Sequence, residues 1–356
     1  MEKFILKNLN LLRVLIAILI GVTISVFLIL FMSNEPGFSL EALLLGPFLT
    51  RSRLGNLVET AAPILFCGLA VAIPFQAGLF NVGAEGALYL GAVAGTAVAV
   101  STRLPAIVHI PLVLITAGLT GALWGFIPGF LRSKWRVSEL VTTLMLNYIA
   151  LYLGLYLINY HFRDKAAGFL TSYRLPETSW LNQFIPGTRI HAGIFLALLF
   201  AVLVYILLYR TRLGYEIRMC GSNIHFSKYG GINIKKVIIL SQVIGGMIAA
   251  IGGICEIMGI YRRFSWQDSP GYGWDGVVVA IIAKNNPLLI IPASLFLAYL
   301  RIGGGLVKLH SDIPTETISI IQAVIILLIT ADAFLSGWKN RITIKEAKEI
   351  PNESLA

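Results

Sequence analysis

Uninterrupted apolar runs of about 20 residues recur along this 356-residue chain. A run of that length lets an α-helix cross the ~30 Å hydrocarbon core of a bilayer. Only 13% of the residues are charged, about half the roughly 25% found in an ordinary soluble domain. The polar–apolar alternation of an outer-membrane barrel is absent from the runs. The chain is therefore expected to be an all-α polytopic membrane protein.

About ten spans fit between charged residues, prolines and glycines. They cover residues 14–32, 57–75, 83–101, 106–131, 138–160, 192–209, 236–259, 275–284, 287–301 and 318–336. The first span follows three basic residues, as a signal peptide does, but its length and the lack of a cleavage site predict a retained helix. The eighth and ninth are short and are expected to be tilted or re-entrant. The ten-residue segment Leu40–Leu49 is expected at the membrane interface.

Lysine and arginine residues set the expected orientation. Their dense clusters at 132–136, 210–236 and 339–348 all fall on one side of the ten-span topology. The positive-inside rule makes that side cytoplasmic, so both termini are expected in the cytoplasm. The same rule accounts for the net charge of +10 without a nucleic-acid partner.

The expected organisation is a transmembrane domain over residues 1–340 and a cytoplasmic tail over 341–356. The domain carries a cytoplasmic loop at 210–236 and an irregular extracytoplasmic loop at 161–191. Three scattered cysteines give no disulfide framework.

Three dipeptide matches suggest an inverted repeat, although chance matches are the alternative. The partners lie 176 to 190 residues, or five spans, apart: Glu85-Gly86 with Asp275-Gly276, Pro111-Leu112 with Pro287-Leu288, and Ser138-Glu139 with Thr315-Glu316. A shift of five spans reverses orientation, which is a common transporter architecture with the solute path at the repeat interface.

A polar joint separates the second and third spans, with the sequence Phe80-Asn81-Val82-Gly83-Ala84-Glu85-Gly86. Hydrocarbon disfavours polar side chains, so such a joint is expected either to cap helix ends or to contact a solute. As caps, Asn81 would begin the third span and Glu85 would lie in its first turn, where the helix dipole favours a carboxylate.

The fifth span carries a polar stripe that begins at Ser138, a candidate N-cap. Glu139, Thr143 and Asn147 follow at intervals of four residues and share one helix face; Thr142 is their polar neighbour. Such a stripe either bonds the helix to its neighbours or lines a water-filled path.

Other polar groups lie within spans, and Glu256 is the most demanding of them. A charge at the bilayer centre costs about 2.5–3.5 kcal/mol, so Glu256 should have a partner or face water. Small-residue spacings such as Gly121-x-x-x-Gly125 predict close helix packing. The aromatic-rich segment Tyr261–Trp274 is expected either as an interface belt or as a surface that docks a partner or stacks a planar solute.

The loop at 210–236 contains the signals of a short, isolated helix. Asn223 or Ser222 provides an N-cap, and Gly230-Gly231 provides a left-handed end. At the cytoplasmic face this helix is either a rigid knob for a soluble partner or part of a solvated basic loop.

Motifs for chemistry are missing from the sequence. It contains no phosphate-binding P-loop, no H-E-x-x-H and no G-x-S-x-G. We therefore expect neither catalysis nor a cofactor.

Five segments, taken in order, resemble the permease subunits of bacterial ABC importers for nucleosides, a group related to the ribose and branched-chain amino-acid permeases. They are Gly78–Gly86, Val137–Tyr148, Leu213–Arg218 with Gly221–Asn223 and Gly230–Asn233, Pro270–Gly276, and Asp312–Glu316. The resemblance implies that the domain over 1–340 is a permease that moves a nucleoside across the cytoplasmic membrane by alternating access.

The resemblance also implies partners: a cytoplasmic ABC ATPase, a second homologous permease, and an extracytoplasmic substrate-binding lipoprotein. It implies a coupling helix that docks on the ATPase through Gly221, Asn223, His225, Lys228, Tyr229 and Gly230. The candidates to line the substrate path are Asn81, Glu85, Thr142, Thr143, Asn147 and Asp275.

Three alternatives stay open at this point. A riboflavin or sugar permease would share the same superfamily. A stand-alone ion-coupled transporter would use Glu85, Glu256 and Asp275 for protons. A membrane scaffold would transport nothing.

Overall fold

The computed structural model of the protein describes residues 36–310 and the single residues 23, 27 and 323. Every regular element in this part of the chain is helical, as the sequence predicts. The long helices are α3 (Arg51–Gln76), α4 (Ala84–Ser101), α5 (Ala106–Trp135), α6 (Glu139–Leu157), α7 (Gly193–Arg210), α10 (Ile234–Glu256) and α12 (Pro287–His310). The shorter ones are α2 (Pro36–Leu44), α8 (Arg212–Ser222), α9 (Ile224–Tyr229) and α11 (Tyr272–Ile282), with single turns at Gly46–Phe48, Ile158–Phe162, Glu177–Ser179 and Ile257–Tyr261.

Seven helices within the described residues are long and apolar enough to cross a membrane. They match the second to seventh and the ninth of the predicted spans. The ninth was predicted to end at Arg301, yet α12 continues to His310, and Arg301 is paired with Asp275. The predicted spans 14–32 and 318–336 lie outside the described residues.

The eighth predicted span is α11, whose 11 residues give about 16 Å of helix. That length cannot cross a ~30 Å hydrocarbon core. This short helix packs against α3 and α4 and joins α12 by a tight turn in which Lys284 and Asn285 are left-handed. One of its ends must therefore be satisfied by other parts of the protein.

The chain divides into two units, residues 47–302 and a second unit formed by 1–46 with 303–356. In the second unit, α2 contributes Leu43, whose carbonyl lies against Gly303. All the candidate site residues within the described part of the chain belong to the first unit, here called the bundle unit.

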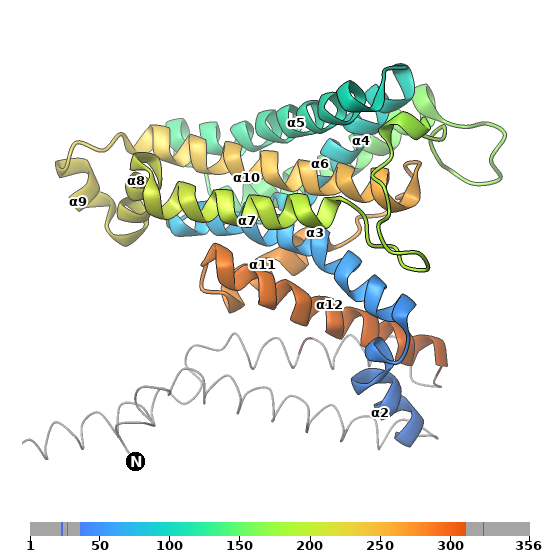
Figure 1. Ribbon diagram of the computed structural model, residues 1–356. Coiled ribbons are helices and arrows are strands. Elements are labelled where there is room, and N and C mark those ends of the chain that lie inside the picture. The colour runs from blue at the N-terminus through green and yellow to red at the C-terminus, as the bar shows by residue number, and fades with distance from the viewer. Residues whose placement is uncertain (1–22, 24–26, 28–35, 311–322, 324–356) are drawn as a thin grey trace, which may run out of the picture. The chain divides into compact units, whose positions relative to one another are not determined.

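Helices α3 and α10 form the centre of the bundle unit. The most apolar 18-residue stretch of α3 is 94% buried, whereas the corresponding stretches of α5, α6 and α7 are each 28% buried. Helix α10 packs against α3, α4 and α5, and α3 packs against α7 (Figure 1). The outer helices therefore leave large apolar faces for lipid.

Small residues allow α5 and α10 to approach closely, as their spacing predicts. A Cβ on Gly121 would lie 2.2 Å from the carbonyl oxygen of Gly246, and one on Gly125 would lie 2.3 Å from that of Gln242. These two positions admit no side chain, so the seam depends on glycine.

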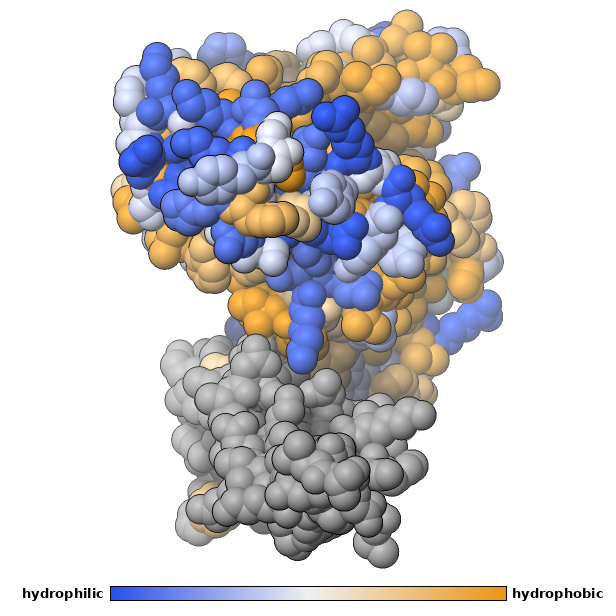
Figure 2. Space-filling model, turned by 90° about the vertical axis from the view of Figure 1, so that its left-hand side faces the viewer, coloured by the Kyte–Doolittle hydropathy of each residue, from blue (hydrophilic) through white to orange (hydrophobic). Residues whose placement is uncertain are grey.

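The two ends of the bundle unit differ. Helices α8 and α9 lie together at one end, and the irregular segment 163–191 lies at the other (Figure 1). Figure 2 shows hydrophilic residues gathered over the α8–α9 end, while apolar residues cover its flanks. The bundle unit therefore has the polar ends and apolar sides of a membrane protein.

The aromatic residues of the segment Tyr261–Trp274 do not all lie at the surface, as an interface belt or a docking surface would require. Phe264 and Trp266 are buried against Tyr89, whose hydroxyl donates a hydrogen bond of 2.9 Å to the Trp266 carbonyl. Only Tyr261 and Trp274 expose their rings substantially. Three of its five aromatic residues, Phe264, Trp266 and Tyr272, are buried, which local composition does not reveal.

Candidate functional site

The segment 77–83 connects α3 to α4 inside the bundle unit and contains residues 80–83 of the polar joint. Gly78 turns the chain with a φ of +75°, a conformation that favours glycine. Asn81 and Glu85 are buried, with 7% and 2% of their surface exposed. Backbone groups in such a buried segment must find internal partners.

The polar stripe of α6 supplies several of these partners. Asn147 accepts a 2.9 Å hydrogen bond from the Gly86 amide through Oδ1 and donates one of 3.0 Å from Nδ2 to the Val82 carbonyl. One turn earlier, Thr143 Oγ1 accepts from the Val82 amide at 3.4 Å. Another turn earlier, Glu139 Oε1 accepts from the Phe80 amide at 3.3 Å. The stripe therefore bonds α6 to the joint, one of its two predicted uses.

The prediction that Asn81 is the N-cap of α4 is wrong. The N-cap is Gly83, which offers no side chain, and Asn81 Oδ1 instead accepts from the Gly83 amide at 2.6 Å. Asn147 caps the helix from α6 by accepting from Gly86. A cap supplied from a distant helix leaves no local signal in the sequence.

Asn81 also reaches across the bundle to α10, where its Nδ2 donates a short hydrogen bond to Gln242 Oε1. Asn81, Thr143, Gln242 and Trp124 line a cavity of about 10 Å³. Trp124 Nε1 and Gln242 Nε2 are buried there, and neither has a partner among the described residues. Two free donors thus border a small space beside the joint. The sequence analysis did not select Trp124.

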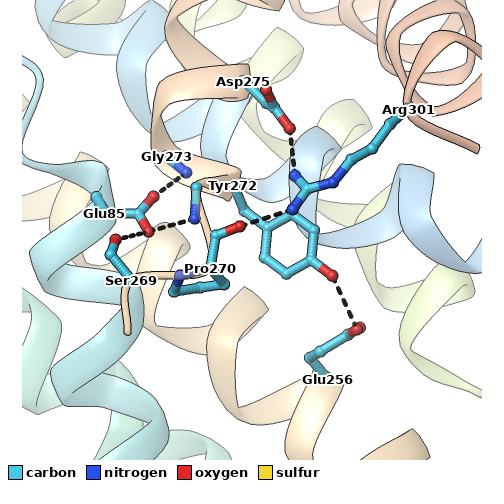
Figure 3. A network of polar contacts seen from close by, with 9 residues as sticks. Glu85, Glu256, Ser269, Pro270, Tyr272, Gly273, Asp275 and Arg301 are labelled. Atoms are coloured by element: carbon cyan, nitrogen blue, oxygen red, sulfur yellow. Dashed lines mark hydrogen bonds and ion pairs between the residues drawn. The ribbon is translucent and has the colours of Figure 1, made fainter. Parts of the chain in front are cut away.

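Glu85 connects α4 to the start of α11 (Figure 3). Its carboxylate accepts hydrogen bonds from the Gly271 amide at 2.7 Å, from the Gly273 amide and from the Ser269 hydroxyl. The N-cap of α11 is Gly271, which has no side chain to cap with. Since a helix start leaves amides unpaired, Glu85 satisfies α11 while it also occupies the first turn of α4.

Asp275 belongs to a second group of charges on the other side of α11 (Figure 3). Arg301 of α12 donates to Asp275 and, at 2.7 Å, to the Pro270 carbonyl. Its guanidinium also lies 4.6 Å from the centre of the Tyr272 ring. The Tyr272 hydroxyl donates at 3.4 Å to Glu256, which has Glu59 as a neighbour. The prediction that Glu256 has a partner is confirmed.

The path candidates are thus distributed over two neighbouring groups. Asn81, Glu85, Thr143 and Asn147 meet at the joint, and α11 links Glu85 to Asp275. Thr142 is not bonded to the joint, and its hydroxyl donates to the backbone carbonyl of Ser138 at 2.9 Å.

The ATPase-coupling candidates lie on α8 and α9. Asn223 caps α9 by accepting from the amides of His225 and Phe226, both at 3.0 Å. Gly231 ends it with a φ of +77°, as predicted. Exposed residues cover most of this helix, with Tyr229 at 93% and Phe226 at 61%.

The end of α8, which leads into α9, contacts the segment between α3 and α4. A Cβ on Gly221 would lie 2.1 Å from the Gln76 carbonyl oxygen and 3.0 Å from the Gly78 nitrogen. The end of α8 therefore packs directly on the backbone where α3 ends. Within residues 36–310, no cluster of His, Cys, Asp or Glu side chains could hold a metal ion.

Replacing Glu85 with glutamine removes a charged acceptor from three donors. Hydrogen bonds to charged groups contribute about 1.5–3 kcal/mol, so we expect E85Q to lower the free energy of unfolding by an amount in that range. Chemical denaturation of the purified protein in detergent measures it. The control is D268N, which neutralises an exposed acid of the adjoining loop and should leave stability unchanged. Equal stability of E85Q and the wild type would refute the capping role.

Comparison with known proteins places the chain in a family. Residues 53–330 match the family described as the permease component of the branched-chain amino acid transport system. The guanosine ABC transporter permease protein NupP of Bacillus subtilis is 35% identical over 326 residues, which cover 90% of this chain and 93% of that one. The nucleoside ABC transporter permease protein NupB of Lactococcus lactis is 31% identical, covering 88% of this chain and 89% of that one.

A third relative is named for a different solute. The glucose ABC transporter permease protein TsgB13 of Haloferax volcanii is 34% identical over 80% of this chain and 78% of its own. No solved structure matches the chain. With its seven candidate spans, the chain is a multi-pass membrane protein that belongs to the permease family of the branched-chain amino acid transport system and its ABC transporter relatives.

Proposed function

We propose that this protein is the permease subunit of an ATP-driven importer that moves nucleosides across the cytoplasmic membrane by alternating access. The observation that carries the proposal is the match to two permeases named for guanosine and nucleosides, each over about nine tenths of both chains. The proposed permease domain covers residues 1–340, with the loop at 210–236 in the cytoplasm, and the tail at 341–356 follows it.

The chemistry of the joint supports an uncharged, polyhydroxylated solute. The side chains of Asn81, Thr143 and Gln242 are amides and a hydroxyl, which donate and accept hydrogen bonds without fixing a net charge. The free donors Trp124 Nε1 and Gln242 Nε2 suit ribose hydroxyls or base edges. In this proposal the small cavity is a closed part of the substrate path, and the bonds of Glu85, Asn147 and Asp275 hold its walls in place.

A proton-coupled mechanism has less support from the same groups. Glu85 is engaged by three donors, and Asp275 is paired with Arg301. Carboxylates held in this way are suited to positioning helices. Energy in the proposal comes instead from a separate ATPase chain.

Helix α9 provides the surface for that ATPase. It is short, capped at both ends, and exposes Phe226 and Tyr229 at the polar end of the bundle unit. Gly221, in the last turn of α8, packs on Gln76 and Gly78. Because α9 follows α8 directly, a push on α9 reaches the end of α3 through α8. A second homologous permease and an extracytoplasmic binding lipoprotein complete the proposed complex.

A sugar is the second candidate for the solute. The glucose permease of Haloferax volcanii is as similar in identity as the nucleoside permeases, although it covers less of both chains. Sugars and nucleosides share the ring hydroxyls that amide and hydroxyl groups bind.

Reconstituted transport distinguishes these functions. The full complex in liposomes, with its ATPase, second permease and binding lipoprotein, should take up labelled guanosine or uridine when ATP is inside. Uptake should not require an ion gradient. Labelled glucose should neither enter nor compete. Uptake of glucose but not nucleosides would select the sugar function, and uptake that fails with an ionophore would contradict the ATP-driven mechanism.

Truncation of the exposed aromatics of α9 tests the coupling surface. Loss of a central interface side chain typically costs at least about 2 kcal/mol, so the F226A/Y229A variant should bind the ATPase roughly 30-fold more weakly. Co-purification and surface plasmon resonance in detergent measure this affinity.

The matched control for that variant is Y215A. Tyr215 lies on α8 at the same end and is 52% exposed. Its substitution therefore removes an exposed aromatic ring and leaves α9 unchanged. Equal affinity of F226A/Y229A and wild type for the ATPase would place the coupling surface elsewhere.

A further inference from the structure

A groove of about 610 Å³ opens at the polar end of the bundle unit, between the end of α5 and the segment that joins α9 to α10. Basic side chains surround it: Arg132, Arg136, His225, Lys228 and Lys235. Its apolar lining consists of Ile224, Ile232, Ile234 and Ile238. This end is the hydrophilic face of Figure 2.

Most of the positive charge in the groove is uncompensated. Arg132 pairs with Glu139 at 3.1 Å. Arg136, Lys228 and Lys235 have no carboxylate partner among the described residues, and all three are exposed. No acidic residue lines the groove, so its occupant should carry negative charge.

Neighbouring aromatic residues place the groove at the membrane boundary. Trp135 is 59% exposed and directly precedes Arg136. The Lys134 ammonium lies 5.4 Å from the ring centres of both Phe130 and Trp135. Exposed tryptophan with lysine at the end of an apolar helix is typical of the headgroup level of a bilayer. Farther along α5, Leu119 and Leu123 are exposed as lipid-facing residues.

We propose that this groove binds an anionic phospholipid. The phosphate would lie between Arg136 and Lys235, which lie outside α9, and part of an acyl chain would cover the isoleucines. Basic pockets between membrane helices bind anionic headgroups in this way. A free phosphate ion or an acidic peptide would satisfy the charge but would leave the isoleucine lining uncovered. The proposal is independent of the transported solute.

Native mass spectrometry of the full-length protein tests this site. The detergent-purified chain is titrated with phosphatidylglycerol or with phosphatidylcholine of the same acyl chains. We expect one phosphatidylglycerol to bind more tightly than any phosphatidylcholine. A basic residue near the surface contributes about 1 kcal/mol to binding an anionic lipid, so R136Q/K235Q should weaken this binding by on the order of tenfold or more.

The control variant is R210Q/K236Q, which removes two exposed charges from the same end without touching the groove. It should bind phosphatidylglycerol as the wild type does, and inorganic phosphate should not displace the lipid. An equal loss in both variants would reduce the effect to general surface charge and overturn the site. Normal lipid binding by R136Q/K235Q, with weakened ATPase binding, would assign the groove to a protein interface instead.

Discussion

The contact on which the bundle unit depends is the hydrogen bonding of one buried carboxylate, Glu85, to the start of α11. A helix that does not cross the membrane leaves one end among apolar neighbours, where unpaired amides cost several kcal/mol each. Glu85 satisfies two of those amides and the Ser269 hydroxyl. Because it also lies in the first turn of α4, it holds the starts of two helices together.

The other contacts of the joint follow the same physical rule. Asn147 and Glu139 on α6 bind backbone groups of the joint, and Gln242 on α10 binds Asn81. Gly221, in the last turn of α8, then brings α8 against the end of α3. Helices α3, α6, α8 and α10 thus meet at the segment between α3 and α4. A displacement of one of these helices is therefore transmitted to the others. In the proposed permease this is where force from an ATPase would reach the substrate path.

Local features of the sequence predict much of this fold. Hydropathy places seven of the spans, because burial in lipid demands long apolar runs whatever their packing. The caps of α9 are also local, since Asn223 and Gly231 act within a few residues of themselves. The small-residue seam between α5 and α10 is visible as spacing, although its partner helix is not.

Contacts between distant segments explain what the sequence could not predict. From the sequence, the charge of Arg301 predicts the end of a span. In the structure Arg301 is paired with Asp275, and α12 extends past it to His310. Asn147 caps a helix 61 residues away. Trp124 gives no sign of its buried donor, because indoles in apolar helices usually pack as hydrophobic residues. The solute is not encoded in any local pattern, so its assignment depends on relatives and transport assays.

The most direct test of the account is a double-mutant cycle between Glu85 and Ser269. Unfolding free energies of E85Q, S269A, the double variant and the wild type are measured in the same detergent. If the carboxylate holds the start of α11, the two changes should be non-additive, with a coupling of about 0.5–3 kcal/mol. Additive effects would show that Glu85 is not coupled to Ser269 in the segment that leads into α11, and would contradict the account.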